Sequence, residues 1–215
     1  ITPPANSDAD FSLDVTVTVP DGGDTNVQTG SFDVSVAADA DAPTLVLDET
    51  ASGSEDTAIA LDISSALTDT DGSESLSISI SDIPDGAVLM DADGNEITVT
   101  DGSATLSPDQ LAGLTITPPD DYSGTFDLTV SATSTEADGG DTATTTGTIS
   151  VNVDAVADAA ELTTAAASGT EDTAIPLSIT AVSTDSDGSE SVSIEISNIP
   201  DGAVLTDGDG NQITV

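Results

Sequence analysis

An internal repeat constrains the fold of this 215-residue chain more than any other feature of its sequence. Residues 52–59, Ser-Gly-Ser-Glu-Asp-Thr-Ala-Ile, return as Ser-Gly-Thr-Glu-Asp-Thr-Ala-Ile at residues 168–175, an offset of 116 (168 − 52). The motif Ile-Thr-Pro-Pro at residues 1–4 returns at residues 116–119. Self-similarity at a fixed spacing is typical of chains built from repeated structural units. The sequence therefore predicts a tandem array rather than one globular domain.

The repeat also predicts where the units begin and end. Residues 43–157 form one complete repeat, preceded by the C-terminal part of a repeat over residues 1–42 and followed by the N-terminal part of another over residues 158–215. We expect the sequence to be a window from a longer array, because isolated half units of such arrays are not stable alone. The lack of a signal peptide then carries no information.

Apolar and polar residues alternate with a period of two in several segments of the repeat, which is the pattern of half-buried strands. Examples are Ile59/Leu61/Ile63, Leu76/Ile78/Ile80, Ile97/Val99, Leu114/Ile116, Phe126/Leu128/Val130 and Ile149/Val151/Val153. Gly-, Pro- and Asp-rich turn signals separate them. About seven strands in one unit predict an all-β fold of tandem antiparallel Greek-key β-sandwiches. One helical turn is expected at residues 108–112, between Ser107 as N-cap and Gly113.

The composition excludes several classes of function. The chain has 41 Asp and Glu residues but no Lys, Arg, His or Cys. It therefore lacks a basic patch for nucleic acid, the nucleophiles of Ser-His-Asp and Cys-His enzymes, and thiolate or imidazole metal ligands. Paired carboxylates could serve a glycosidase, but one Tyr and no Trp leave few aromatic platforms for a sugar. We expect no enzymatic activity, no nucleic-acid partner and, without a long apolar run, no membrane insertion.

The negative charge needs a physical account. A formal net charge of −41 destabilises a compact state by self-repulsion, although 36% hydrophobic residues argue against a disordered chain. Some of the Asp residues are expected to form a solvated surface. Others are expected to bind divalent cations that supply the missing positive charge.

A strand count predicts that the acidic motifs gather at the two ends of the complete repeat. If the strand at residues 44–47 runs downward, residue 55 lies at the lower end and the loop 69–74 returns to the upper end. The upper junction then gathers Asp39, Asp41, Asp69 and Asp71. The lower junction gathers Glu55, Asp120 or Asp121, Asp154, Asp158, Asp185 and Asp187. Each junction draws ligands from neighbouring units and their linker.

Calcium suits these oxygen-rich clusters best, because Ca²⁺ takes six to eight oxygen ligands in irregular geometry while Mg²⁺ demands a tighter octahedron. An EF-hand loop is excluded because Leu67 and Ile78 occupy positions where it needs acidic residues. The turn at residues 91–95 is interpreted as a hairpin turn, with a metal site as the alternative, and the turn at residues 138–141 is similar.

These motifs carry a resemblance to a known family. Asp-Ala-Asp-Ala-Pro at residues 39–43, followed by Glu55 and by an Asp-x-Asp motif at residues 69–71, resembles the interdomain calcium pattern of cadherin repeats. The wider repeat resembles the cadherin-like or Ig-like extender repeats of giant bacterial RTX adhesins. The resemblance implies an end-to-end array, type I secretion and tethering at the outer membrane of a Gram-negative cell. It also implies that Asp39, Asp41, Glu55, Asp69 and Asp71 bind calcium.

The second linker departs from the first. Val156 stands where the first linker has Asp39, and Ala160 stands where it has Pro43. We therefore expect the number or affinity of the metal ions to differ between junctions.

The resemblance and the repeat together predict a spacer that projects a distal binding domain for cell adhesion or biofilm formation, with neighbouring repeats of the same chain as its partners. Two alternatives stay open. One is a module that itself binds a ligand. The other is a self-assembling extracellular filament in which homotypic contacts let half units of different chains complete one another.

Overall fold

The structure, a computed structural model, describes residues 1–69, 71–185 and 187–213. The chain forms two compact units, Ile1–Ala155 and Val156–Val215. Strands are the main regular elements of both units, and no α-helix occurs within the described ranges. The prediction of an all-β chain is confirmed, whereas the predicted repeat boundaries and the Greek-key order stay predictions.

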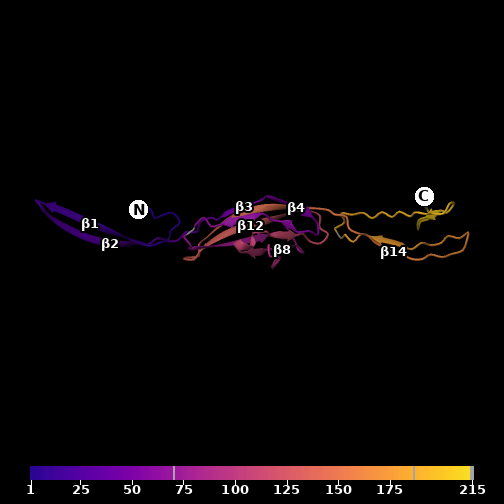
Figure 1. Ribbon diagram of the computed structural model, residues 1–215, viewed down its shortest axis with the longest axis horizontal. Coiled ribbons are helices and arrows are strands. Elements are labelled where there is room, and N and C mark those ends of the chain that lie inside the picture. Colours follow the sequence, from indigo (N-terminus) through magenta and orange to yellow (C-terminus); the bar gives the residue numbers. More distant parts are fainter. Residues whose placement is uncertain (70, 186, 214–215) are drawn as a thin grey trace. The chain divides into compact units, whose positions relative to one another are not determined.

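A long two-stranded ribbon opens the first unit and is drawn in indigo and purple in Figure 1. Strand β1 (Phe11–Asp21) pairs antiparallel with β2 (Asp24–Val34). Valine and threonine alternate along β1, which is a pattern suited to a pleated strand. Both faces of this ribbon are largely exposed, and Val17 and Phe32 are among its exposed apolar side chains.

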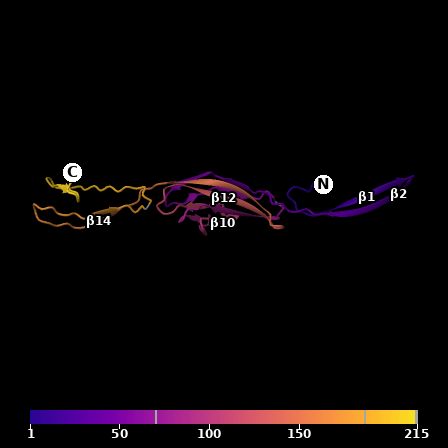
Figure 2. The same ribbon diagram turned by 180° about the vertical axis from the view of Figure 1, so that it is seen from behind.

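Two larger sheets and one strand pair make up the rest of the first unit. The five-stranded sheet has the order β10-β7-β12-β13-β4, and Figure 2 labels β10 and β12 from behind. Its strands are β10 (Ala104–Leu106), β7 (Glu74–Ser81), β12 (Gly124–Glu136), β13 (Thr142–Asp154) and β4 (Thr50–Ser54). The four-stranded sheet holds β5 (Ile59–Ala60), β11 (Thr115–Thr117), β8 (Val88–Met90) and β9 (Glu96–Ile97). The separate pair is β3 (Thr44–Leu47) with β6 (Ile63–Ala66).

Side chains from both larger sheets fill one aliphatic core. Along β12, Leu128, Val130 and Ala132 are fully buried, while the residues between them are more exposed. Leu128 and Val130 share the core with Leu89 and Ile116 of the other sheet. Several antiparallel sheets around a common core are consistent with a β-sandwich, and the period-two pattern correctly identified the inward-facing residues.

One pairing departs from the antiparallel prediction. Strand β4 lies parallel to β13, in a register that matches Val153 with Gly53. The first strand of the complete repeat is interrupted after Leu47, so that β3 pairs with β6 and β4 pairs with β13. Because the first and last strands of the repeat run in the same direction, a pairing between them has to be parallel.

The expected helical turn is present but short. It is a 3₁₀ helix, η1 (Pro108–Gln110), and the Ser107 N–H donates a 2.9 Å hydrogen bond to Oε1 of Gln110. Gly113 follows it with a φ of 68°, a left-handed conformation that glycine adopts without strain. Among the residues that the structure describes, no helix has the length and apolarity needed to cross a membrane.

Gly53 packs so closely that a side chain there would collide with the core. A Cβ built on Gly53 would lie 2.7 Å from Cγ1 of Ile59, and one built on Gly169 would lie 2.6 Å from Cγ1 of Ile175. The same close approach therefore recurs 116 residues further along (169 − 53). Ile59 is buried and β-branched, so it has little freedom to turn away.

We predict that Gly53→Ala lowers the free energy of unfolding by about 1–3 kcal/mol, the usual cost of overpacking. Urea unfolding would measure the change. Gly30→Ala is the matched control, because Gly30 also lies within a strand but a Cβ added there would meet no atom within 4 Å. Equal effects of the two substitutions would show that the close approach to Ile59 does not matter.

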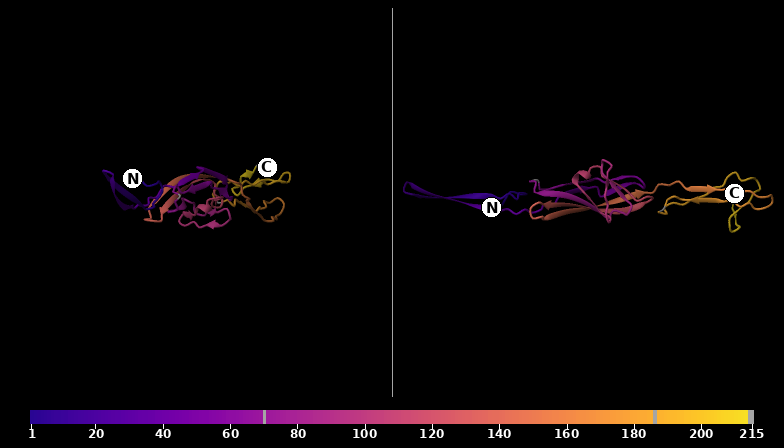
Figure 3. Two further views of the ribbon diagram at one scale, coloured as in Figure 1. Left: turned by 60° about the vertical axis from the view of Figure 1, so that its left-hand side comes forward. Right: turned by 90° about the horizontal axis from the view of Figure 1, so that it is seen from below.

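The second unit is more open than the sandwich (Figure 3). It holds two short antiparallel pairs, β14 (Glu161–Thr164) with β15 (Ile179–Val182) and β16 (Leu205–Thr206) with β17 (Gln212–Ile213). Its apolar residues are widely exposed. Ile194, for example, is 55% exposed, whereas Ile78, its equivalent 116 residues earlier, is fully buried in β7.

Candidate metal centre

Acidic side chains line a cavity where residues 36–41 approach the sandwich. The cavity has a volume of about 320 Å³ and is bordered by residues 2–8 and 36–39 on one side. Of the ligands predicted for the upper junction, Asp39, Asp41 and Asp69 all line it. Asp71 lies in the adjoining loop. Three of the four acidic residues that the strand count assigned to this end of the repeat thus line one cavity, and their role as ligands stays a prediction.

Hydroxyl groups of the sandwich hold the backbone of the linker in place. Ser134 donates to the carbonyl oxygen of Asp41, and Thr145 donates to that of Pro43 at 2.7 Å. Thr68 donates to the carbonyl oxygen of Ala42, also at 2.7 Å. These bonds occupy three consecutive backbone carbonyls, so a cation at this position would depend mainly on carboxylate oxygens.

The loop between β6 and β7 orients its own carboxylates. The Asp71 N–H donates to Oδ1 of Asp69 at 2.8 Å, and the Ser73 N–H donates to Oδ1 of Asp71 at 2.9 Å. Hydrogen bonds from Ser73, with a smaller one from the backbone of Asp8, hold the pKa of Asp71 below its usual value. Asp69 is only 5% exposed, whereas Asp71 is exposed. Asp69 is therefore the buried carboxylate of this motif.

Two glutamates that were not among the predicted ligands lie at the same end. Glu74 of β7 and Glu136 of β12 are directly opposite each other in the antiparallel ladder. Oε1 of Glu74 accepts the N–H of Asp41 at 2.8 Å. Burial is the main cause that raises the pKa of Glu136, partly opposed by the Ser73 hydroxyl, and the charge of Glu74 raises it further. Both glutamates occupy inward-facing strand positions.

The alternation along β12 contained a signal for Glu136. Buried positions recur at every second residue from Leu128 onward, and the last two of them are Ser134 and Glu136. A carboxylate that continues an inward-facing apolar series indicates a buried charge at the end of the sandwich. Asp8, which also lines the cavity, gave no comparable signal.

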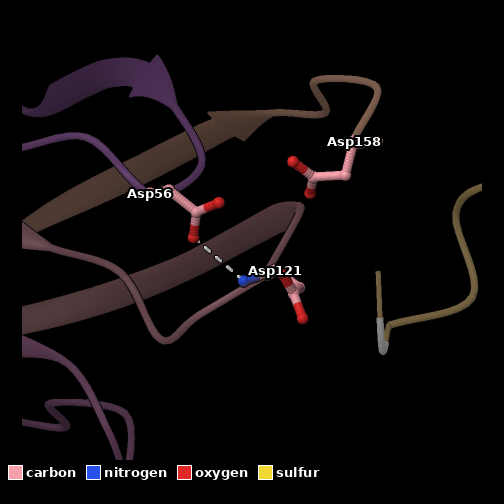
Figure 4. Close-up of side chains that lie close together, drawn as sticks. All are labelled: Asp56, Asp121 and Asp158. Carbon is pink, nitrogen blue, oxygen red and sulfur yellow. Dashed lines mark hydrogen bonds between the residues drawn. The ribbon is translucent and has the colours of Figure 1, made fainter. Parts of the chain in front are cut away.

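At the opposite end of the sandwich, the carboxylates of Asp56 and Asp121 approach each other. The Asp121 N–H donates to Oδ1 of Asp56 at 3.1 Å, and oxygen atoms of the two carboxylates lie within 4.8 Å. Figure 4 draws both side chains and this bond, together with Asp158 of the second unit. Asp56 and Asp121 belong to a group of three acidic residues that could hold a metal ion. Asp56 was not among the predicted ligands.

The other predicted ligands of this end are arranged differently. Glu55 is 2% exposed, and its N–H donates to the carbonyl oxygen of Asp154 at 3.1 Å. The side chain of Asp154 is exposed and follows the outward-facing series of β13. Asp120 is an exposed turn residue. Asp56 and Asp121 have φ angles of 56° and 57°, a conformation that aspartate tolerates in turns, so both also have a structural role.

Within the second unit, the linker and the acidic loop repeat the bonds of the first. The N–H of Asp158 donates to Oε1 of Glu190, as that of Asp41 does to Glu74. Thr184 donates to the carbonyl oxygen of Ala159 at 3.0 Å. The predicted ligands Asp185 and Asp187 lie in this loop, where the Asp187 N–H donates to Oδ1 of Asp185 at 2.8 Å.

The turn at residues 91–95 is a hairpin turn, as predicted. It joins β8 to β9, and Asp91 accepts the N–H groups of Asp93 and Asn95 at 3.0 and 2.9 Å. The Asn95 side chain, the largest contribution, lowers the pKa of Asp91 below its usual value. Donors thus already surround this carboxylate, which leaves little room for a cation. The turn at residues 138–141, which joins β12 to β13, is fully exposed.

No protein-family model matches the chain, and no curated protein matches it significantly.

Proposed function

We propose that the chain is a stretch of calcium-stiffened spacer repeats from a large bacterial cell-surface adhesin. In this proposal the repeats follow one another end to end outside the cell and carry a distal binding domain away from the surface. Calcium ions at the junctions offset the repulsion between carboxylates and turn each flexible linker into a rigid joint. The function is mechanical, and the repeats carry out no reaction.

The observation that carries this proposal is the acidic cavity beside the first linker. Asp69 is nearly inaccessible, and Asp39 and Asp41 border the same cavity. A buried carboxylate is costly unless it is paired or coordinates a metal ion. The chain has no Lys, Arg or His that could pair with these groups. A divalent cation from the solution is the remaining source of strong compensating charge.

The donor set fits calcium. Asp39, Asp41 and Asp69 offer carboxylate oxygens, the ligand type that Ca²⁺ prefers. They come from the linker and from the loop between β6 and β7 rather than from one rigid element. The recurrence of the linker bonds at Asp158 and Glu190 supports the idea that each junction is built in the same way.

Paired spin labels can test the stiffening. The chain has no Cys, so Thr18→Cys on β1 and Thr146→Cys on β13 would carry the only two labels. We expect the distribution of distances between the labels to narrow markedly when calcium is added and to broaden again with EGTA. Pulsed electron–electron double resonance would measure both distributions.

Two sets of Asp→Asn variants test the site itself, one at carboxylates that line the cavity and one at an exposed carboxylate elsewhere on the sandwich. Asp39→Asn combined with Asp69→Asn should abolish the narrowing, whereas Asp62→Asn, at an exposed position of the sandwich, should preserve it. Distributions of equal width with and without calcium would contradict the proposal that calcium stiffens this joint.

A further inference from the structure

We propose that Glu74 and Glu136 together form an inner divalent-cation site beside the acidic cavity, which Glu136 lines. The inference rests on the proposed function for its choice of calcium as the ion. It differs from the predicted junction site because its two ligands are strand residues of the sandwich and belong to neither the linker nor the Asp-x-Asp motif.

Glu74 and Glu136 face each other in the register of two neighbouring strands. Glu136 of β12 is the direct Cα partner of Glu74 of β7. Side chains that face each other in this way have Cβ atoms about 4.5–5.5 Å apart, and like charges there are destabilising. The next partners along the same face are Ser134 with Leu76 and then Ala132 with Ile78, so the glutamate pair continues the apolar inner face of the sheet.

Both glutamates also have a buried carboxylate oxygen without a hydrogen-bond partner. Glu136 is 3% exposed and lines the cavity. Its Oε1 accepts a long hydrogen bond from the Ser73 hydroxyl, at 3.4 Å, while its Oε2 is buried and has no hydrogen-bond partner. Oε2 of Glu74 is likewise buried without a partner. Among the described residues, the pair thus presents two uncompensated carboxylate oxygens on one inward face.

A divalent cation resolves both difficulties at once. It converts the repulsion between two opposed carboxylates into a bridge, and it gives each buried oxygen a partner. Asp69 and Asp8 border the same cavity and can complete an oxygen shell with water molecules. A shared proton is the competing explanation, since it too would relieve the repulsion between two neighbouring carboxyl groups.

Neutral variants separate these explanations. Glu136→Gln keeps the size of the side chain, and its amide can donate a hydrogen bond to Glu74. In EGTA we therefore expect Glu136→Gln to raise the melting temperature of the chain by a few degrees. In calcium we expect titration calorimetry to show one fewer ion per chain, or an affinity about tenfold or more weaker at that site, with the remaining sites unchanged.

The control is Glu96→Gln, which makes the same change at an exposed position of β9 and should leave both measurements unaltered. Glu74→Gln should reproduce the effects of Glu136→Gln. Unchanged calcium stoichiometry and affinity in both glutamate variants would overturn the inner site and favour the shared proton. A lower melting temperature of Glu136→Gln in EGTA would overturn it as well, because it would mean that the pair is not repulsive.

The two proposals fail in different ways. If the wild-type chain binds calcium and stiffens but the glutamate variants bind it equally well, the inner site is wrong and the spacer function stands. If calcium binds at Glu74 and Glu136 without narrowing the distances between the spin labels, the spacer function is wrong and the inner site stands. A wild-type chain that binds no calcium would overturn both.

Discussion

Adding EGTA to the calcium-loaded chain should lower the melting temperature of the sandwich, residues 43–155, by about 10 °C or more. One ion present at about 100 times its dissociation constant stabilises the folded state by roughly 2.7 kcal/mol. For a domain of about 100 residues, each kcal/mol corresponds to about 4–8 °C in melting temperature. The loss is large because the chain has a formal net charge of −41 and no cationic side chain to take the place of the ion.

Scanning calorimetry or circular dichroism in calcium and in EGTA would measure this shift. The control is sodium chloride at equal ionic strength, because salt also weakens repulsion between exposed charges further apart than about 8 Å. Screening by salt does not place a bound cation against the buried carboxylates of Asp69 and Glu136. If sodium chloride restored stability as well as calcium does, general repulsion rather than site binding would explain the effect, and the junction sites would be refuted.

The sequence predicted the inner faces of the strands better than their pairing. Alternation identified Ile78, Ile80 and Val130 as core residues because burial on one face of a sheet requires a period of two. It could not reveal that the first strand divides at Leu47 and that its second half pairs in parallel with β13. Periodicity reports which face is buried, but it contains no information about which strand lies alongside.

The strand count placed some acidic residues of the candidate site together, but it could not tell which of them face inward. A strand count was sufficient to bring Asp39, Asp41 and Asp69 to one cavity, because it depends only on the direction of each strand. It could not tell inward from outward positions at strand ends, so it included the exposed Asp154 and omitted the buried Glu136. Closely spaced acids form a recognisable motif, whereas a single acid that continues an apolar series, such as Glu136, does not.

Equivalent positions of the repeat differ in burial, and this allows a test of the core with one type of substitution. Ile78→Ala should lower the free energy of unfolding by about 2–5 kcal/mol, because it removes most of a side chain that is 0% exposed in β7 and leaves a cavity. Ile194→Ala removes the same side chain from the equivalent position, which is 55% exposed in the second unit, and should change the stability by no more than about 0.5 kcal/mol. Urea unfolding of the two variants, with calcium held constant, would measure both values.

The comparison holds residue type and repeat position constant, so the difference between the variants reports burial. An equally large loss for Ile194→Ala would mean that the second unit buries this residue in solution, and the open arrangement described for that unit would then be wrong.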